Sequence, residues 1–421
     1  MASASIDATL SAAIDADTST EEILLAATNH DLDALRKLFR TYDAKVQDSD
    51  TGFSPLHAAI ASCEPDEHVQ DETGMNGEGD AINGHALSEQ SALATVQLLF
   101  ENGAIWNELD NNDDTPGCLA LRLGLSKVYD AIVDAGVRAE LLFSRLDDYE
   151  LLPDEPVDGE DGTHDDDHHD DDDIIGFEPA PKRNEPLPRN TNGPVLTNPN
   201  VNSEDYLRSN LTYSADRLLD SDKNAVMMDW ETEIMKISAN KLCPKPGLRT
   251  MNVGFGMGIV DTMFLANSPA EHHIVEAHPQ VIERMREKGW FEKPNVRIHQ
   301  GKWQDVLPKL IAEGVELDAM YYDTYAEDYS DLKLFFDEYV IALLGTHGLF
   351  GFYNGLGADR QVCYDVYTKV VEFHLDEAGL DVEWMDIDVP DLAGRGEWEG
   401  VRRPYWANIK TYRLPTCKFL G

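Results

Sequence analysis

Long apolar segments and paired cysteines are both missing from this sequence. No run reaches the roughly 18 apolar residues of a transmembrane helix, so we expect no membrane-spanning segment. The five cysteines are scattered and form no CxxC pair, which indicates neither a disulfide framework nor a cysteine-based zinc site. The opening residues are acidic and contain no Lys or Arg, unlike a secretory signal or a transit peptide. A reducing location, cytoplasmic and nuclear, is therefore expected.

Basic residues are also scarce. The 421 residues include 34 Lys and Arg against 79 Asp and Glu, which gives a formal net charge of −45 at pH 7. The negative electrostatic field of such a chain repels phosphate groups and favours basic partners. We therefore expect no direct nucleic-acid partner and no membrane partner. The 42% of hydrophobic residues still suffices for folded cores, and the length suggests two or three domains of about 150 residues.

The composition changes abruptly over residues 151–200. Residues 154–173 hold 12 acidic residues and no Lys or Arg, and a stretch rich in Pro and Asn follows. Because such a segment buries too little apolar surface to offset its chain entropy, we expect an acidic, disordered linker. An alternative function is metal buffering by His164, His168 and His169, although the segment offers no defined ligand geometry.

The residues before the linker contain a repeat. Residues 51–59, TGFSPLHAA, resemble the ankyrin consensus, residues 95–104 resemble its second helix, and residues 113–116 resemble the start of another repeat. The spacing predicts an all-α ankyrin-repeat domain over residues 1–150 with an inserted loop near 63–90. His57 occupies a consensus position from which it is expected to hydrogen-bond a neighbouring turn rather than bind a ligand.

Residues 201–421 alternate between short apolar strands and helical segments, which predicts an α/β fold with a doubly wound, mainly parallel, Rossmann-like sheet. A strand over 248–253 leads into the glycine turn 254–258 and then into a helix. The next strand ends in Glu276, where a carboxylate can accept hydrogen bonds from both ribose hydroxyls of an adenosine cofactor. A final strand is expected over 405–412.

Two motifs flank this turn, MMDWE at residues 227–231 and YDTY at residues 322–325. In this order, together with the glycine turn, they resemble guanidinoacetate methyltransferase. With the repeats and the acidic linker, the whole chain is similar to the fungal protein-arginine δ-N-methyltransferase family. The resemblance implies a class I methyltransferase domain. It also implies methyl transfer from S-adenosylmethionine to the δ nitrogen of arginine in a protein substrate, for example a basic ribosomal protein docked on the ankyrin repeats.

The chemistry of the motifs agrees with that resemblance. A guanidinium group holds its proton with a pKa above about 12 and is a poor nucleophile, so a catalyst must localise electron density on one nitrogen. Two carboxylates can do so, if one orients the N–H groups and the other accepts the proton that is lost. Our hypothesis makes Asp323 the base and Glu231 the orienting partner; a helix cap and a surface ion pair are their structural alternatives.

The resemblance also implies a set of cofactor contacts and no metal. Trp303 follows the third strand, where its edge could cover an adenine or could anchor the core. The implied contacts are Tyr213, Met227, Met235, Gly254, Phe255, Gly256, Met257, Gly258, Ile259, Glu276, Ala277, His278, Trp303, Gln304 and Asp323.

Two other functions remain open at this point. A methyltransferase for a small guanidine would need a cationic clamp for the substrate carboxylate, whereas an arginine in a protein needs an open groove and a docking surface. A catalytically silent ankyrin adaptor is the other alternative, and intact acidic residues with an intact glycine turn argue against it.

Overall fold

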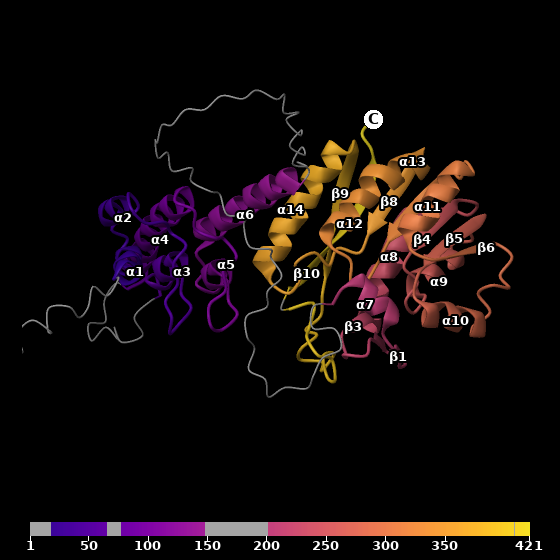
Figure 1. The fold of residues 1–421 in the computed structure, drawn as a ribbon, viewed down its shortest axis with the longest axis horizontal. Coiled ribbons are helices and arrows are strands. Elements are labelled where there is room, and N and C mark those ends of the chain that lie inside the picture. Colours follow the sequence, from indigo (N-terminus) through magenta and orange to yellow (C-terminus); the bar gives the residue numbers. More distant parts are fainter. Residues whose placement is uncertain (1–17, 65–76, 148–200, 408) are drawn as a thin grey trace, which may run out of the picture.

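The computed structural model describes residues 18–64, 77–147, 201–407 and 409–421. The predicted linker at 151–200, with its three histidines, lies outside the described residues. Two structural parts follow each other along the chain, a helical part up to residue 147 and a sheet-containing part from residue 201 (Figure 1). The helices of the first part are α1 Ser19–Thr28, α2 Leu32–Leu38, α3 Pro55–Ala61, α4 Gly77–Glu101, α5 Pro116–Arg122 and α6 Ser126–Asp147.

Two helix starts in the first part have the same local chemistry. Helix α3 begins at Pro55 after Ser54, and α5 begins at Pro116 after Thr115, so each has a hydroxyl N-cap and a proline at its first position. The buried ring of His57 lies between these starts. Its Nδ1 lies 2.9 Å from Ser54 Oγ, and its Nε2 lies 3.2 Å from the carbonyl oxygen of Asp114. The predicted hydrogen bond of His57 to a neighbouring turn is thus confirmed.

The loop expected near residues 63–90 is wrong from residue 77 onward, because helix α4 already begins at Gly77. Residues 65–76 lie outside the described residues. The glycines of residues 77–90 favour a loop by their local preference. Extending a helix that tertiary packing anchors over residues 92–99 costs far less than nucleating a new one, so weak helix formers are tolerated.

The second part is built on a seven-stranded sheet with the order β6-β5-β4-β7-β8-β10-β9, in which only β10 pairs antiparallel to its neighbours. The predicted mainly parallel, doubly wound sheet is therefore confirmed. Its strands are β4 Arg249–Val253, β5 Glu271–Glu276, β6 Val296–Gln300, β7 Leu317–Tyr322, β8 Leu344–Phe352, β9 Leu380–Asp388 and β10 Thr411–Phe419. A small antiparallel sheet precedes it, formed by β1 Thr212–Tyr213, β2 Arg217–Leu219 and β3 Ala225–Met228.

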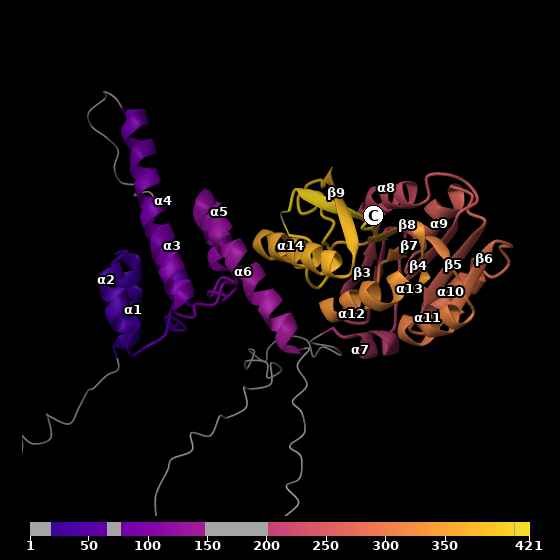
Figure 2. The ribbon, with the colours of Figure 1, turned by 90° about the horizontal axis from the view of Figure 1, so that it is seen from above.

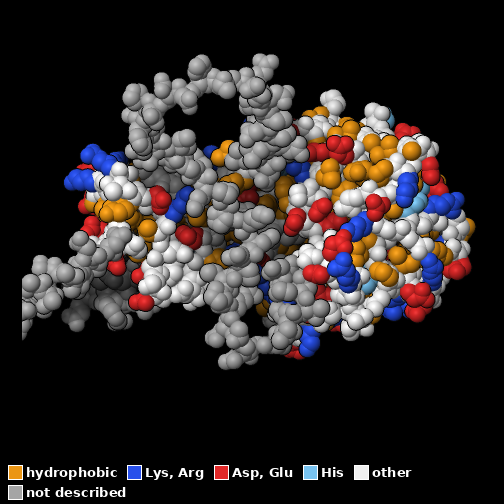
Figure 3. Space-filling view, in the orientation of Figure 1, with side chains coloured by type: hydrophobic (Ala, Val, Ile, Leu, Met, Phe, Trp, Pro, Cys, Tyr) orange, Lys and Arg blue, Asp and Glu red, His pale blue; other side chains and the backbone are white. Residues whose placement is uncertain are grey.

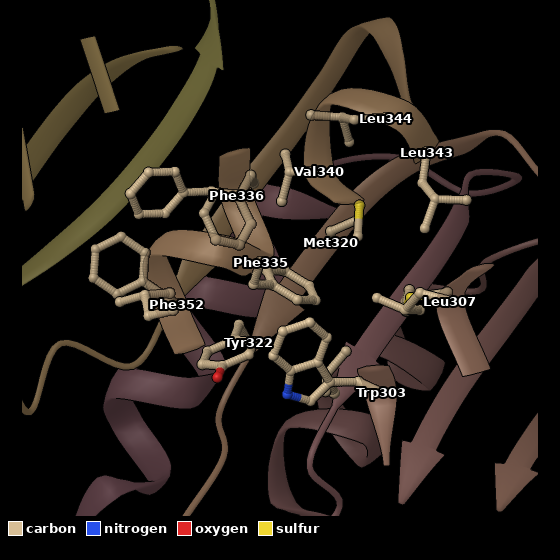
Figure 4. Packing of buried hydrophobic residues seen from close by; sticks show 14 of the residues in the cluster. Trp303, Leu307, Met320, Tyr322, Phe335, Phe336, Val340, Leu343, Leu344 and Phe352 are labelled. Atoms are coloured by element: carbon tan, nitrogen blue, oxygen red, sulfur yellow. The ribbon is translucent and has the colours of Figure 1, made fainter. Parts of the chain in front are cut away.

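Helices cover both faces of the large sheet (Figure 2). Successive residues of β7 show why: Met320 and Tyr322 pack with α11, α12 and α14, while Ala319 and Tyr321 pack with α8 and α9. Figure 4 shows the first of these cores, where the ring of Trp303 meets that of Phe335 edge to face at 5.4 Å. The helices and helical turns of this part are α7 Ser203–Arg208, η1 Asp229–Glu231, α8 Thr232–Leu242, α9 Ile259–Ala266, α10 Pro279–Glu287, α11 Trp303–Ala312, α12 Tyr329–Leu334, η2 Phe335–Val340, α13 Ile341–Leu343 and α14 Gln361–Glu377.

The two parts share one hydrophobic core along α14. Val362, Val366 and Val370 of α14 are buried among the side chains of the helical part. Gly117 and Gly136 allow this approach, because a Cβ at either glycine would stand within 3 Å of a valine methyl group. Polar contacts add to the interface, among them a 2.6 Å hydrogen bond between the Tyr129 hydroxyl and Asp365. The helical part therefore packs directly on the sheet-containing part.

The end of the chain differs from the expectation. The described residues 405–407 and 409–410 belong to no strand; β10 begins only at Thr411, and the segment 389–407 forms turns and bends. The aromatic residues of this segment are used in packing against η1 and α14 instead of in a strand. We call residues 398–407 the closing segment.

The excess of acidic residues is not spread evenly. On the face of the sheet-containing part that Figure 3 shows, acidic and basic side chains lie side by side.

No helix in the described ranges has the combination of length and apolar character that crossing a membrane requires.

Candidate active site

The glycine turn follows β4 and leads into α9. Gly254, Gly256 and Gly258 all have positive φ angles, +94°, +55° and +76°, which a residue with a side chain rarely adopts. A Cβ on Gly254 would stand 2.0 Å from the carbonyl oxygen of Asp323, so no side chain fits there. The turn therefore keeps its backbone open to a ligand at the carboxyl end of the parallel strands.

Glu276 ends β5 beside this turn and is 6% exposed. Its Oε2 accepts a 2.9 Å hydrogen bond from the amide of Phe255, and its Oε1 accepts a 2.6 Å bond from the amide of His278. Burial raises the pKa of this carboxyl group, and the backbone amides partly oppose that rise. The amides of Gly256 and Ala277 also act on this carboxylate, so four backbone amides hold it at the end of β5 beside the turn.

A cavity lies over the turn, and we call it the cofactor cleft. Helix α7 contributes Ser203, Tyr206 and Leu207 to its wall. Seven of the predicted cofactor residues line it, namely Met227, Gly254, Gly256, Glu276, Ala277, Trp303 and Asp323.

Most of the remaining predicted residues lie behind the residues that line the cleft. Tyr213 donates a 3.4 Å hydrogen bond to the carbonyl oxygen of Gly256, and the amide of Met257 lies 3.2 Å from the sulfur of Met227. The ring of Phe255 fills the space where Gly258 lacks a side chain. Met235 is buried in the core beneath the turn, together with the partly buried Ile259. These residues support the turn.

His278 and Gln304 have other partners. His278 caps α10, since its Nδ1 accepts a 3.2 Å hydrogen bond from the amide of Gln280, and its Nε2 lies 3.1 Å from the carbonyl oxygen of Tyr206. The ring thus holds α7 over the cleft. The side-chain amide of Gln304 lies 3.4 Å from Glu327.

Trp303 anchors the core and also borders the cleft, and its contact with an adenine stays a prediction. It is 3% exposed, and its Nε1 donates to Glu327 at 3.0 Å. Tyr322 also donates a short hydrogen bond to Glu327. Glu327 is therefore fixed between two aromatic residues at the edge of the cofactor cleft.

A second cavity adjoins the first, and we call it the acidic pocket. The two cavities share Val226, Asp323, Thr324, Tyr325 and Glu327. The described residues that line the acidic pocket include four carboxylates and no Lys or Arg. They are Ala225, Val226, Glu231, Tyr322, Asp323, Thr324, Tyr325, Glu327, Asp328, Tyr329, Leu332, Tyr353, Gly355, Leu356 and Tyr405.

Asp323 lies directly after β7, where the two cavities meet. Its Oδ2 is buried and has no hydrogen-bond partner among the described residues. Burial, and then the neighbouring charges of Glu231 and Asp261, raise the pKa of this carboxyl group well above its usual value. Burying a carboxyl oxygen without a hydrogen-bond partner is unfavourable, so this position suits a cationic ligand that can supply the missing partner.

Glu231 ends the short helix η1 and is 5% exposed. Its Oε1 accepts a hydrogen bond from the hydroxyl of Tyr405, which in turn accepts a 3.0 Å bond from Nε1 of Trp230. Burial raises the pKa of Glu231 to about 7, while the bonds from Tyr405 and from the Met228 amide oppose the rise. The structure thus brings Glu231 and Asp323 to one pocket.

Three contributions were absent from the sequence-based set. Tyr405 reaches Glu231 from the closing segment, Glu327 joins the two cavities, and α7 covers the cofactor cleft. Glu327 lies four residues after Asp323, and this spacing was the only local signal for it. Among the described residues, no group of three or more potential ligands is arranged to hold a metal ion.

Comparison with known proteins agrees with this geometry. The protein arginine N-methyltransferase 2 of Aspergillus fumigatus is 55% identical over 417 residues, covering 96% of this chain and 97% of its own. The chain belongs to the protein arginine N-methyltransferase 2 family. The member from Emericella nidulans is 53% identical and that from Gibberella zeae 45%, covering 97% and 95% of this chain and 98% and 93% of their own. The family model for guanidinoacetate N-methyltransferase matches residues 203–380.

As a protein arginine N-methyltransferase 2 relative, the chain is an S-adenosylmethionine-dependent enzyme that methylates arginine. The cofactor cleft fits this donor, because it offers an open glycine turn and a carboxylate at the end of β5 for a ribose. The acidic pocket fits the acceptor, because its carboxylates match a cation.

Proposed function

We propose that the enzyme methylates the δ nitrogen of an arginine residue in a basic protein, with Asp323 as the base and Glu231 as the orienting carboxylate. The observation that carries the proposal is that both carboxylates line one pocket, free of Lys and Arg among its described residues, which joins the cofactor cleft at Asp323. S-Adenosylmethionine supplies an electrophilic methyl group when it is bound in the cleft.

Asp323 is suited to accept the proton. The guanidinium proton is held with a pKa above about 12, and a base with a raised pKa accepts it more readily than an ordinary aspartate. The unpartnered Oδ2 of Asp323 provides the acceptor atom, and its position between the cavities places it beside both reactants. Loss of this proton localises a lone pair on the attacking nitrogen.

Glu231 is suited to orientation. Its carboxylate is held by Tyr405 on one oxygen and by the Met228 amide, at 3.3 Å, on the other. A carboxylate fixed in this way can accept two parallel N–H bonds from the planar guanidinium fork. The charge of the arginine then compensates the carboxylates that repel each other in the empty pocket.

A small-guanidine substrate is the competing proposal. Guanidinoacetate carries a carboxylate, and the described lining of the acidic pocket gives it no cationic partner and four repelling acids. An arginine residue within a protein carries no such group near its guanidinium. The choice of the δ nitrogen rests on the resemblance of the motifs to the fungal family.

We further propose that the helical part is an ankyrin-repeat domain that docks the substrate. The matching starts of α3 and α5, and the link from His57 to Asp114, support a repeated unit. A net charge of −45 supports a basic partner, such as a ribosomal protein, met in the cytoplasm or nucleus.

The test combines labelled S-adenosylmethionine, a cell extract and mass-spectrometric fragmentation of labelled proteins. We expect label in a basic protein, on the δ nitrogen of arginine, and no label in free guanidinoacetate. A terminal-nitrogen product would contradict the regiochemistry, and labelled guanidinoacetate without labelled protein would establish the small-guanidine alternative.

A further inference from the structure

Tyr329 connects the acidic pocket to the helical part of the protein. It is the first residue of α12, lines the acidic pocket and lies six positions after Asp323. Its ring packs both against the core of the sheet-containing part and against the core that α14 shares with the helical part. One side chain thus contacts the proposed substrate pocket and the domain interface.

A hydrogen-bonded chain leads from Tyr329 to helix α6. The Tyr329 hydroxyl lies 2.7 Å from Nδ1 of His374, and Nε2 of His374 lies 3.2 Å from Oγ of Ser144. The rings of Tyr329 and His374 are stacked at 5.7 Å, and His374 is 2% exposed. Ser144 belongs to α6, whereas His374 belongs to α14 of the sheet-containing part.

The direction of this chain follows from the other hydrogen-bond partner of Ser144. The Ser144 hydroxyl donates to the carbonyl oxygen of Leu141 at 3.0 Å, so its oxygen can only accept from Nε2–H of His374. In a neutral ring, Nδ1 is then the acceptor, and the Tyr329 hydroxyl donates to it. The rotamer of Tyr329 and the tautomer of His374 are therefore both set from helix α6.

We propose that Ser144 and His374 are positioning residues for Tyr329, so that the helical part helps to shape the arginine pocket in addition to any docking role. The inference rests on the assignment of the acidic pocket to arginine. Tyr329 begins the helix that follows the loop 323–328, and this loop carries both Asp323 and Glu327. An altered Tyr329 therefore displaces the pocket wall next to the proposed base.

The interface offers a matched control. Arg145 is the neighbour of Ser144 on α6 and pairs with Glu377 of α14 at 3.1 Å, but both side chains are more than half exposed and neither lines the acidic pocket. An Arg145→Gln variant therefore perturbs the same interface without touching the chain to Tyr329.

The experiment is a double-mutant cycle with Tyr329→Phe and Ser144→Ala in the full-length protein. Each variant is expected to lower kcat/KM for an arginine-containing protein substrate about three- to ten-fold, the effect of losing one hydrogen bond. The double variant is expected to be no worse than Tyr329→Phe alone, because both changes break one chain. S-Adenosylmethionine binding, measured by calorimetry, should stay within about two-fold, because Tyr329 does not line the cofactor cleft.

The outcomes separate the inference from the proposed function. Additive losses, a Ser144→Ala enzyme with full activity, or an equal loss in Arg145→Gln would each overturn the positioning chain. Asp323→Asn is assayed in parallel: its inactivity alongside a fully active Ser144→Ala enzyme rejects only the chain, whereas an active Asp323→Asn enzyme rejects the proposed base.

Discussion

Gly254 of the cofactor turn lies directly against the backbone of Asp323, the proposed base. The position of a Cβ on Gly254 is 2.0 Å from the Asp323 carbonyl oxygen, and the Asp323 amide donates a 2.9 Å hydrogen bond to the carbonyl of Val253. The glycine turn and the proposed base are thus held together through their backbones. In the proposed function this contact would set the distance between the methyl donor and the arginine.

Replacing Gly254 by alanine tests this contact. We expect Gly254→Ala to lose at least about 3 kcal/mol of stability, because it combines a steric clash with a positive φ angle. Gly247→Ala is the control: its φ is +85° but no atom lies within 4 Å of its Cβ position, so only about 1 kcal/mol should be lost. Thermal unfolding and calorimetric titration with S-adenosylmethionine measure both. Equal losses in the two variants would show that the contact is unimportant.

The Asp323→Asn substitution tests the base. We expect it to retain S-adenosylmethionine binding while kcat falls about 100- to 10,000-fold, the usual contribution of a general base. Asp305→Asn, at an exposed position of α11, is the control and should keep normal turnover. Single-turnover assays with labelled donor provide the measurement. Near-normal turnover of Asp323→Asn would remove Asp323 from its proposed role.

The pH dependence tests Glu231. Its pKa of about 7 means that the side chain is neutral at lower pH, so kcat/KM for the arginine substrate should fall as the pH drops below 7. In Glu231→Gln this fall of kcat/KM on the acid side, the acid limb of the pH profile, should disappear, and activity should be low at every pH. A wild-type profile that stays flat from pH 8 to pH 6 would contradict the assignment.

The same pKa predicts a change in stability. The folded state binds this proton more tightly than the unfolded state, so the contribution of Glu231 to stability is complete below about pH 4.5 and is lost as the pH rises to 7. Relative to Glu231→Gln, the wild-type protein should lose about 3 kcal/mol between pH 5 and pH 8. Urea unfolding at both pH values measures this difference, and an unchanged difference would argue against a buried, titrating Glu231.

The Tyr405→Phe substitution tests the closing segment. The hydrogen bond from Tyr405 lowers the pKa of Glu231, so its loss should shift the acid limb of the activity profile to higher pH. The substitution also leaves Nε1 of Trp230 without the acceptor at 3.0 Å. Tyr42→Phe, at an exposed position of the helical part, is the control. An unshifted limb in Tyr405→Phe would show that the segment does not act on Glu231.

Local sequence patterns were sufficient for most of the sheet and for part of the site. The strand before Gly254, the acid at the end of β5 and the acid after β7 follow from apolar runs ended by residues with a specific chemistry. Such patterns depend on neighbours within a few residues, so they can be recognised without knowing how the helices and strands pack. They placed Glu276 and Asp323 at strand ends, whereas Glu231 was identified through the resemblance of the MMDWE motif.

The errors lie where tertiary contacts override local preference. Residues 77–90 contain glycines that favour a loop, yet helix α4 continues through them because its later turns are anchored in the core. Residues 405–410 are aromatic and apolar enough for a strand, yet Tyr405 and Trp406 pack on Trp230 instead. The contacts by which His278 caps α10 and holds α7 likewise depend on packing that no local pattern predicts, and its contact with the cofactor stays a prediction.

The sequence by itself determined most of the sheet and the positions of Glu276 and Asp323, because residue chemistry and short-range periodicity suffice to place a carboxylate at the end of a strand. Glu231, at the end of η1, was identified through the resemblance of its motif. Only the tertiary structure decided what surrounds those acids. Tyr405 lies 174 positions from Glu231, and Ser144 lies 230 positions from His374. Contacts over such separations depend on how whole elements pack, and no local pattern in the sequence specifies that packing.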